Sequence, residues 1–258
     1  MGLFAENRHE HILNELRSKG RLKVKELAKS LDVTEVTIRR DLCYLQDNGL
    51  LKKTYGGAVL AGPSSMQSLV SYRQTQNSTA KQIIGEIAAS RIDDGDNIYL
   101  EAGSTCYEII PYLENKKDLT VIVNSVNLMT RLHEQTHHRI LVTGGEYRAE
   151  TMDMIGPTAE AAISQLGAFT AFTSADVISV ESGISGRDIA TVSFTRQVLM
   201  RANKKIFVGI KSKFNKAALY KIADLEDLDC IITDSFPGAR WRDAALQKNI
   251  ELLYPDTD

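Results

Sequence analysis

The chain is poor in cysteine and contains no long hydrophobic run. Its three cysteines, Cys43, Cys106 and Cys230, include no C-x-x-C pair, which argues against a disulfide framework and a zinc site. The five histidines form no ligand pattern with nearby cysteines or carboxylates. No apolar run approaches the roughly 20 residues that a membrane span requires, and the first residues lack the apolar core of a signal peptide. We therefore expect no metal, no membrane attachment and a reduced, cytoplasmic location.

Nucleotide fingerprints and a dominant charge are also missing. Neither G-x-G-x-x-G nor G-x-x-x-x-G-K-[ST] occurs, so we expect no nucleotide cofactor. The net charge of the whole chain is only −2. Residues 1–60 contain 11 Lys/Arg and 8 Asp/Glu, a net charge of +3, and the remaining residues contain 20 and 25, a net charge of −5. A mildly basic head on an acidic body is compatible with a DNA-binding module joined to another domain.

The segment VTEVTIRRDLCYL, residues 33–45, predicts a helix with a face suited to the major groove of DNA. Thr34 is a good N-cap, because its hydroxyl can accept a backbone N–H of the first turn. One apolar stripe contains Ile38, Leu42 and Leu45, and the residues facing away from it are Val36, Thr37, Arg39 and Arg40. Arginine can contact phosphates or guanine, and threonine or valine methyls can contact thymine. The alternative is a helix whose arginines are merely solvated.

The neighbouring segments favour DNA binding. Apolar periodicity predicts helices over residues 7–19 and 24–31, and the turn at Asp32-Val33 gives a helix-turn-helix arrangement. Residues 50–55 and 58–60 can pair as a hairpin around Gly56-Gly57. This hairpin would be the wing of a winged helix, with Lys52 and Lys53 on phosphates, unless those lysines are only a solvated edge.

The segment ELAKSLDVTEVTIRRDLCYLQDNGLLKKTYGGAVL resembles the N-terminal domain of the DeoR family of bacterial transcriptional regulators. The family's Thr-Ile-Arg-Arg-Asp-Leu helix is matched at Thr37–Leu42, and its Gly-Gly wing at Gly56-Gly57; Tyr55 stands where many members carry His. The resemblance implies that Asp41 is structural and pairs with a nearby Arg or Lys. The residues expected to contact double-stranded operator DNA are Thr34, Val36, Thr37, Arg39, Arg40, Lys52, Lys53, Tyr55, Gly56 and Gly57.

A linker and a second domain are predicted after the head, residues 1–60. Residues 61–72 are rich in Ser, Gly and Pro and lack periodicity. Residues 73–258 alternate short apolar runs with helical segments, which predicts a doubly wound, mostly parallel α/β domain. The predicted strands are 97–101, 119–123, 139–143, 169–176, 205–210, 229–233 and 250–253. The predicted helices are 79–91, 105–113, 126–135, 158–166, 192–202 and 238–248.

The loops at the carboxyl ends of these strands predict a ligand site, because ligands of such folds bind there. Gly, Ser, Thr and Asn at helix starts can hold a phosphate, although each is first of all a cap or a turn. Glu101 can accept hydrogen bonds from sugar hydroxyls. The residues expected to contact an effector are Glu101, Gly103, Ser104, Thr105, Asn124, Ser125, Gly144, Gly145, Asp176, Lys211 and Lys213.

The second domain also resembles the DeoR effector domain, which is similar to sugar-phosphate isomerases of the ribose-5-phosphate isomerase and CoA-transferase fold group. Family motifs are matched at Glu101–Thr105 (with Glu for Asp), 123–125, 144–145, 155–157 and 212–214, whereas 174–177 and 209–211 depart from the family pattern. The resemblance implies a repressor of a carbohydrate-utilisation operon, a homo-oligomer (dimer or tetramer) controlled by a phosphorylated sugar.

Two alternatives to this reading stay open. One is an isomerase- or deaminase-like enzyme with an appended DNA module, for which Glu101 and Asp176 are the candidate bases. The other is an orphan regulator whose second domain only oligomerises. Between these, we expect a regulator without catalytic residues.

Overall fold

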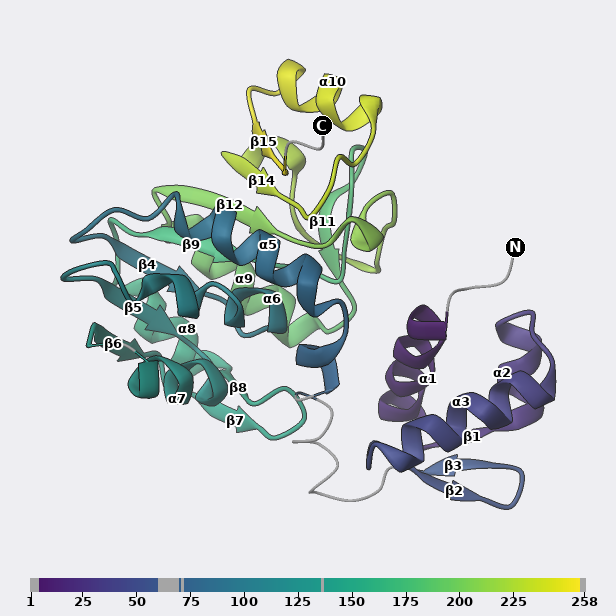
Figure 1. Cartoon of the computed structure of the whole chain (residues 1–258). Coiled ribbons are helices and arrows are strands. Elements are labelled where there is room, and N and C mark those ends of the chain that lie inside the picture. The colour runs from purple at the N-terminus through teal and green to yellow at the C-terminus, as the bar shows by residue number, and fades with distance from the viewer. Residues whose placement is uncertain (1–4, 60–69, 71, 136, 256–258) are drawn as a thin grey trace. The chain divides into compact units, whose positions relative to one another are not determined.

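The computed structural model describes residues 5–59, 70, 72–135 and 137–255, and the chain forms two compact units, Met1–Gln76 and Asn77–Asp258 (Figure 1). Within those described ranges, no helix is long and apolar enough to cross a membrane. Each unit has a hydrophobic core of its own.

The first unit is a winged helix-turn-helix, as predicted. Its elements are α1 (Ala5–Lys19), β1 (Arg21–Lys23), α2 (Val24–Ser30), α3 (Glu35–Asp47), β2 (Lys52–Thr54) and β3 (Gly57–Val59). Gly20, at φ +70°, follows the end of α1, and the predicted stripe of Ile38, Leu42 and Leu45 is fully buried. The helices therefore pack through the apolar periodicity that is visible in the sequence.

Strand β1 was not predicted, and it completes a three-stranded sheet in the order β1-β3-β2. It pairs antiparallel with β3, with Leu22 opposite Ala58. Three residues between two helices are too short to show a strand pattern. The pairing is possible only because Gly57 has no side chain: a Cβ there would lie 1.9 Å from the carbonyl oxygen of Leu22.

Most of the predicted linker, residues 61–69 and 71, lies outside the described residues. Its last residue, Tyr72, is buried with the core of the first unit, and residues 72–75 are helical. The first compact unit therefore continues to Gln76 and includes the end of the predicted linker.

The second unit is built on a seven-stranded parallel sheet in the order β15-β14-β12-β9-β4-β5-β6. These strands are β4 (Asn97–Leu100), β5 (Thr120–Val123), β6 (Arg139–Val142), β9 (Thr170–Thr173), β12 (Lys204–Val208), β14 (Cys230–Ile232) and β15 (Glu251–Leu253). The order runs outward in both directions from the neighbours β4 and β9. The doubly wound α/β fold is thereby confirmed.

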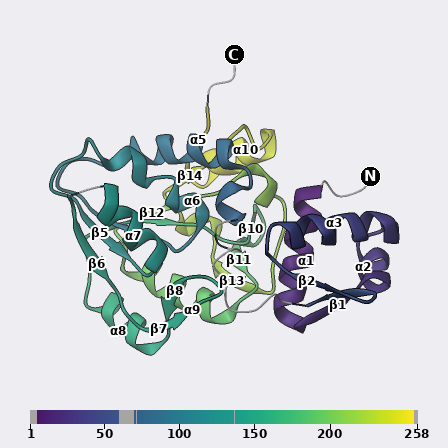
Figure 2. The ribbon, with the colours of Figure 1, turned by 60° about the horizontal axis from the view of Figure 1, so that its bottom comes forward.

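Helices cover both faces of this sheet (Figures 1 and 2). One core cluster joins the sheet to α5 (Ser78–Ala89), α6 (Ser104–Tyr107), η1 (Ile110–Leu113) and α7 (Val126–Gln135). The other joins it to α8 (Pro157–Ser164), α9 (Ile189–Arg201) and α10 (Ala239–Gln247). Trp241 of α10 is buried and donates a 2.8 Å hydrogen bond to Asn215 Oδ1, so it packs within the unit.

Several predicted boundaries are corrected. The predicted helix over 105–113 is two short helices, α6 and η1, and Pro111 of η1 has no N–H to continue an α-helical ladder. The predicted strand over 169–176 ends at Thr173. Short antiparallel strands were missed: β7 (Glu146–Arg148), β8 (Asp153–Ile155), β10 (Val177–Ser179), β11 (Gly183–Gly186) and β13 (Tyr220–Ala223). They are three or four residues long, too short for a periodic signal.

Candidate DNA-binding surface and effector site

The first turn of α3 is held by the predicted cap. Thr34 Oγ1 accepts a 3.2 Å hydrogen bond from the backbone N–H of Thr37, and the hydroxyls of the two threonines are 3.0 Å apart. Thr34 is exposed and Thr37 is partly exposed. Thr34 therefore caps α3 with its hydroxyl while the N-terminal end of the helix remains exposed to solvent.

The face of α3 opposite its buried stripe is exposed. Val36 is 65% exposed, so its methyl groups are accessible to a ligand. Arg39 donates a 2.8 Å hydrogen bond to Glu35 Oε2 one turn earlier. Arg40 is exposed, and none of the described residues forms an ion pair or hydrogen bond with it. Arg40 can therefore bind an external anion directly. Arg39 can do so once it releases Glu35, which is partly exposed.

The predicted DNA-contacting residues of the wing differ in exposure and in their contacts within the head. Tyr55 is fully exposed at the tip, and Gly56 adopts φ +83° beside it. Lys52 is exposed. The Nζ of Lys53 instead lies 2.9 Å from Cys43 Sγ on α3, so this lysine joins the wing to the helix.

Asp41 is buried and structural, as the resemblance implied. Arg8 of α1 donates to both of its carboxylate oxygens, at 2.8 Å and 3.0 Å. Asp41 raises the pKa of Arg8, chiefly through this hydrogen bonding. His9 Nε2 lies 3.0 Å from Asp41 Oδ1. A carboxylate of the recognition helix is thereby neutralised inside the head.

In the second unit, every predicted effector residue lies in the loop, or in the first turn of a short helix, that follows the carboxyl end of a parallel strand. Glu101, Gly103, Ser104 and Thr105 follow β4; Asn124 and Ser125 follow β5; Gly144 and Gly145 follow β6; Asp176 follows β9; Lys211 and Lys213 follow β12. Because all these strands run parallel, the loops meet at one edge of the sheet. From β4 the chain continues to β5 and β6 on one side of the sheet, and from β9 it continues to β12, β14 and β15 on the other side. Ligands of such folds bind between the two strands at which the direction reverses, here β4 and β9.

Glu101 lies at this divergence and is almost completely buried. Its Oε2 accepts a 2.6 Å hydrogen bond from the backbone N–H of Ser174, which follows β9. Its Oε1 accepts a hydrogen bond from the hydroxyl of Thr195 on α9. Burial raises the pKa of Glu101 to about 7, against the lowering effect of these two hydrogen bonds and of Lys213.

Lys213 approaches the same point from the loop after β12. Its Nζ donates to Ser174 Oγ at 2.8 Å and to the carbonyl oxygen of Ala175 at 2.7 Å. Lys213 therefore adds a positive charge beside the buried Glu101 carboxyl.

Asn124 and Ser125 are buried, and their side chains bond within the protein. Asn124 Oδ1 accepts from the Tyr99 hydroxyl at 3.0 Å and from the Ala102 N–H at 3.1 Å. Ser125 Oγ donates to the carbonyl oxygen of Met152 at 3.2 Å and accepts from the Leu128 N–H at 3.4 Å. In this structure both side chains hold the loops after β4, β5 and β7 in register.

The remaining predicted residues surround this centre. Gly145, at φ +113°, packs so closely on β8 that a Cβ would lie 2.6 Å from the Ile155 carbonyl oxygen. Asp176 is exposed and accepts a 2.8 Å hydrogen bond from the Arg187 N–H. Lys211 is exposed. Thr105 is buried, whereas Gly103 has open space at its Cβ position.

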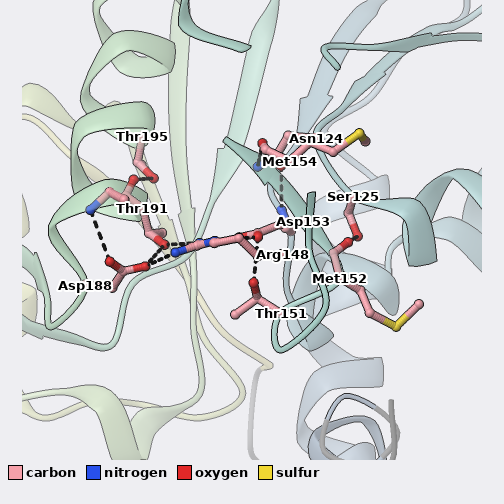
Figure 3. A network of polar contacts seen from close by, with 12 residues as sticks. Asn124, Ser125, Arg148, Thr151, Met152, Asp153, Met154, Asp188, Thr191 and Thr195 are labelled. Carbon is pink, nitrogen blue, oxygen red and sulfur yellow. Dashed lines mark hydrogen bonds and ion pairs between the residues drawn. The ribbon is translucent and has the colours of Figure 1, made fainter. Parts of the chain in front are cut away.

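Sequence reasoning missed a polar network centred on Arg148 of β7 (Figure 3). Arg148 donates to Asp153 Oδ1 and Oδ2 at 2.9 Å and 2.7 Å, to Thr191 Oγ1 at 2.8 Å, and to Asp188. Thr195 Oγ1 contacts the Thr191 carbonyl oxygen at 3.0 Å as well as Glu101. The β7–β8 hairpin is thereby connected through α9 to Glu101.

Electrostatics bind this network together. Partial burial opposes charge on Arg148, but the hydrogen bonds that it donates to Asp153 and Asp188 raise its pKa. Partial burial likewise opposes charge on Asp188, while hydrogen bonds from Arg148 and Thr191 lower its pKa. Asp188 is the N-cap of α9, accepting from the Ala190 N–H at 3.1 Å, so its capping position was a usable sequence signal. Arg148 gave no such signal, since Asp188 lies 40 residues away.

A winged helix-turn-helix joined to an α/β domain with a polar edge is the architecture of a DNA-binding transcriptional regulator with a sensor domain. The model of the DeoR-like helix-turn-helix domain matches residues 8–63, and that of the DeoR C terminal sensor domain matches residues 76–235. The chain therefore belongs to the DeoR family of transcriptional regulators, which confirms the resemblance.

Curated relatives align over nearly the whole chain. The "Putative aga operon transcriptional repressor" of Escherichia coli O157:H7 is 30% identical, with 95% of this chain and 92% of the relative covered. The "HTH-type transcriptional repressor GlcR" of Bacillus subtilis is 31% identical, with 99% and 98% covered. Among solved structures, ribose 5-phosphate isomerase A from Methanocaldococcus jannaschii is 16% identical with a TM-score of 0.40, over 54% of this chain and 55% of that one.

Proposed function

We propose that this regulator is a repressor of a carbohydrate-utilisation operon that binds its operator through α3 and the wing. The exposed face of α3, with Val36 and Arg40 opposite a fully buried stripe, is the observation that carries this assignment. It offers a cation for phosphate or guanine and apolar methyls for thymine. The repressors named among the relatives support the direction of regulation.

The chain acts as a homo-oligomer in this proposal. One winged helix contacts a short half-site, and two copies on symmetric half-sites double the readout. Binding of an effector then shifts the protein between states that differ in operator affinity.

The effector is a phosphorylated sugar bound at the carboxyl edge of the sheet, around Glu101 and the β4 loop. Glu101, Ser174 and Lys213 bring a carboxyl group, a backbone amide and an ammonium group to the point where β4 and β9 diverge. A carboxyl group accepts from sugar hydroxyls, and an ammonium group attracts a phosphate. Gly103 and Ser104 supply further backbone and hydroxyl groups on the same loop.

Sensing, rather than catalysis, is the role we assign to this edge. Both oxygens of Glu101 already accept hydrogen bonds, from Ser174 and Thr195. Asp176, the other candidate base, is bonded to the Arg187 backbone. These bonds give both carboxyl groups a role in holding the loops together, which favours sensing. Turnover of pentose or hexose phosphates by the purified protein would overturn this assignment.

Two experiments on the full-length protein test the proposal. Selection from a random duplex library, using the wild-type protein as bait, should return a two-fold symmetric operator. A thermal-shift screen should give a hit with a phosphorylated sugar and none with its unphosphorylated counterpart. At about 100 times its dissociation constant, a ligand adds roughly 2.7 kcal/mol of stability. Failure to select any duplex would refute DNA binding, and a silent screen would refute the sugar-phosphate effector.

A further inference from the structure

A buried chain of hydrogen bonds in the head joins the recognition helix to the segment that leads into the sensor domain. The Tyr72 hydroxyl lies 3.1 Å from His9 Nδ1, and His9 Nε2 lies 3.0 Å from Asp41 Oδ1. All three residues are buried, at 7%, 7% and 5% exposure. Asp41 belongs to α3, His9 to α1, and Tyr72 follows the wing and the residues outside the described ranges.

The chemistry of the carboxylate fixes the direction of one of these two bonds. A carboxylate only accepts, so His9 Nε2 carries the proton that it donates to Asp41. At Nδ1 the direction follows the charge of the ring: a neutral ring accepts from the Tyr72 hydroxyl, and a protonated ring donates to it. His9 is the member that links the other two, and removing either of its bonds is costly because a buried ring nitrogen then loses this partner.

His9 contacts α3 a second time. Its ring stacks on Tyr44, with the centroids 4.8 Å apart and the planes 17° from parallel. The hydrogen bond to Asp41 and the stack on Tyr44 lie about one helical turn apart on α3. Two contacts along one helix constrain its rotation and its translation against α1, so His9 sets the position of α3.

Tyr72 stands close to the boundary between the units. It lies in a helical stretch that includes residues 70 and 72–75, and the N–H of Gln76 donates to its carbonyl oxygen at 3.1 Å. Asn77, at φ +51°, then breaks the helix, and α5 of the sensor domain begins at Ser78. A displacement of α5 therefore pulls on a short segment whose buried end is Tyr72.

We propose that Tyr72 and His9 are positioning residues that couple the segment entering the sensor domain to the recognition helix. The inference rests on the proposed function in one respect, because it takes α3 as the DNA-reading element. Moving the segment away from the head either breaks the Tyr72–His9 bond or displaces His9. Either event removes the constraint that His9 places on α3.

Hydrogen exchange of the full-length protein, without DNA or effector, tests this link directly. Tyr72→Phe keeps the ring and removes only the hydroxyl. We expect faster amide exchange both in residues 72–76 and in α3, with the sensor domain unchanged. His9→Phe keeps a ring to stack on Tyr44 and leaves the Arg8–Asp41 ion pair in place, but removes both hydrogen bonds of His9, so it should also speed exchange in residues 72–76 and in α3. Tyr44→Phe is the matched control, because it removes a hydroxyl from the stack on His9 and leaves the hydrogen-bond chain intact; it should change neither segment.

Three outcomes would overturn the proposal: a Tyr72→Phe effect confined to 72–76, a His9→Phe variant in which 72–76 is unaffected, or a Tyr44→Phe variant that matches Tyr72→Phe. If Tyr72→Phe unfolds the head, seen as lost protection throughout α1, the His9→Phe measurement decides the question.

Operator affinity provides the functional readout, with the duplex selected by the wild-type protein as the probe. Tyr72→Phe should weaken binding by up to about five-fold, the limit set by one buried hydrogen bond of about 1 kcal/mol, while Tyr44→Phe binds as the wild type does. Equal affinities of the wild type and Tyr72→Phe would overturn the coupling to DNA binding. If the wild type selects no duplex, the proposed function fails, whereas the exchange measurement still decides whether the link exists.

Discussion

The backbone N–H of Ser174 donates a 2.6 Å hydrogen bond to Oε2 of Glu101, and this bond joins the loops that follow β9 and β4. These two strands are neighbours in the sheet, and the chain winds outward from them in opposite directions. A buried carboxyl group therefore lies where a doubly wound fold opens toward a ligand. Burial raises the pKa of this carboxyl group to about 7, so its ionisation in the folded protein can be followed near neutral pH.

Replacing Glu101 by Gln should change how the stability of the sensor domain depends on pH. Burial raises the folded-state pKa from 4.5 to about 7, so between these values the folded protein binds more protons than the unfolded chain. The free energy of unfolding then falls as pH rises through this window and levels off above about pH 7. Glu101→Gln should remove this fall, on the order of 3 kcal/mol.

Urea unfolding of both proteins across this pH window is the measurement, with the difference between them as the observable. The difference cancels the other titrating groups, which the two proteins share. Parallel curves for the wild type and Glu101→Gln would show that Glu101 ionises in the folded state as it does in the unfolded chain.

Replacing Arg148 by Met should destabilise the sensor domain by about 3–5 kcal/mol, because it leaves a buried carboxylate without its cation. Asp153 is only 3% exposed and accepts two hydrogen bonds from Arg148. Adding Asp153→Asn should recover part of the loss. Arg242→Met is the control, because Arg242 is exposed and its ion pair with Asp243, at 3.6 Å, is exposed as well. This substitution should lower the free energy of unfolding by about 0.5 kcal/mol or less. Denaturant unfolding monitored in the sensor domain gives these values, and equal losses for Arg148 and Arg242 would contradict the assignment.

Alanine at Gly57 should damage the wing far more than alanine at Gly56. A Cβ on Gly57 would lie 1.9 Å from the Leu22 carbonyl oxygen, so β1 and β3 must separate, at about 3 kcal/mol. A Cβ on Gly56 meets no atom within 4 Å, and its φ of +83° costs about 1–2 kcal/mol. Thermal unfolding of the head and operator affinity should rank the variants in this order. The reverse order would mean that β1 pairs differently with the wing.

Arg39→Ala and Arg40→Ala should each weaken operator binding by about 1–3 kcal/mol while leaving the protein folded. A residue that contacts phosphate lowers the salt slope by about one unit, and a residue that reads guanine relaxes specificity at one base pair. Lys19→Ala, at the end of α1 and paired with Glu15 at 3.0 Å, serves as the control. Binding titrations at several salt concentrations separate these cases, and unimpaired binding by both arginine variants would remove α3 as the recognition helix.

Local patterns in the sequence were sufficient for the head. Ile38, Leu42 and Leu45 recur at helical spacing, and all three are fully buried. Thr34 caps α3 as expected. Both features depend on residues a few positions apart, which is the range over which helical periodicity and capping act. Strand β1 was missed because three residues are too short for a strand pattern and because its pairing partner, which includes Gly57, lies more than 30 residues away.

For the sensor domain, the sequence by itself determined the alternation of strands and helices, and with it the parallel sheet and the edge where the candidate loops meet. Runs of apolar residues carry that information, because burial on both faces of a sheet demands them. Only the tertiary structure decided which polar groups face one another at that edge. Glu101 bonds to Thr195, 94 residues later. In the head, likewise, only the tertiary structure decided that Asp41 is connected to Tyr72 through His9. Hydrogen-bond partners so far apart in the chain leave no periodic or local signal, since packing of separate elements, and not spacing along the chain, brings them together.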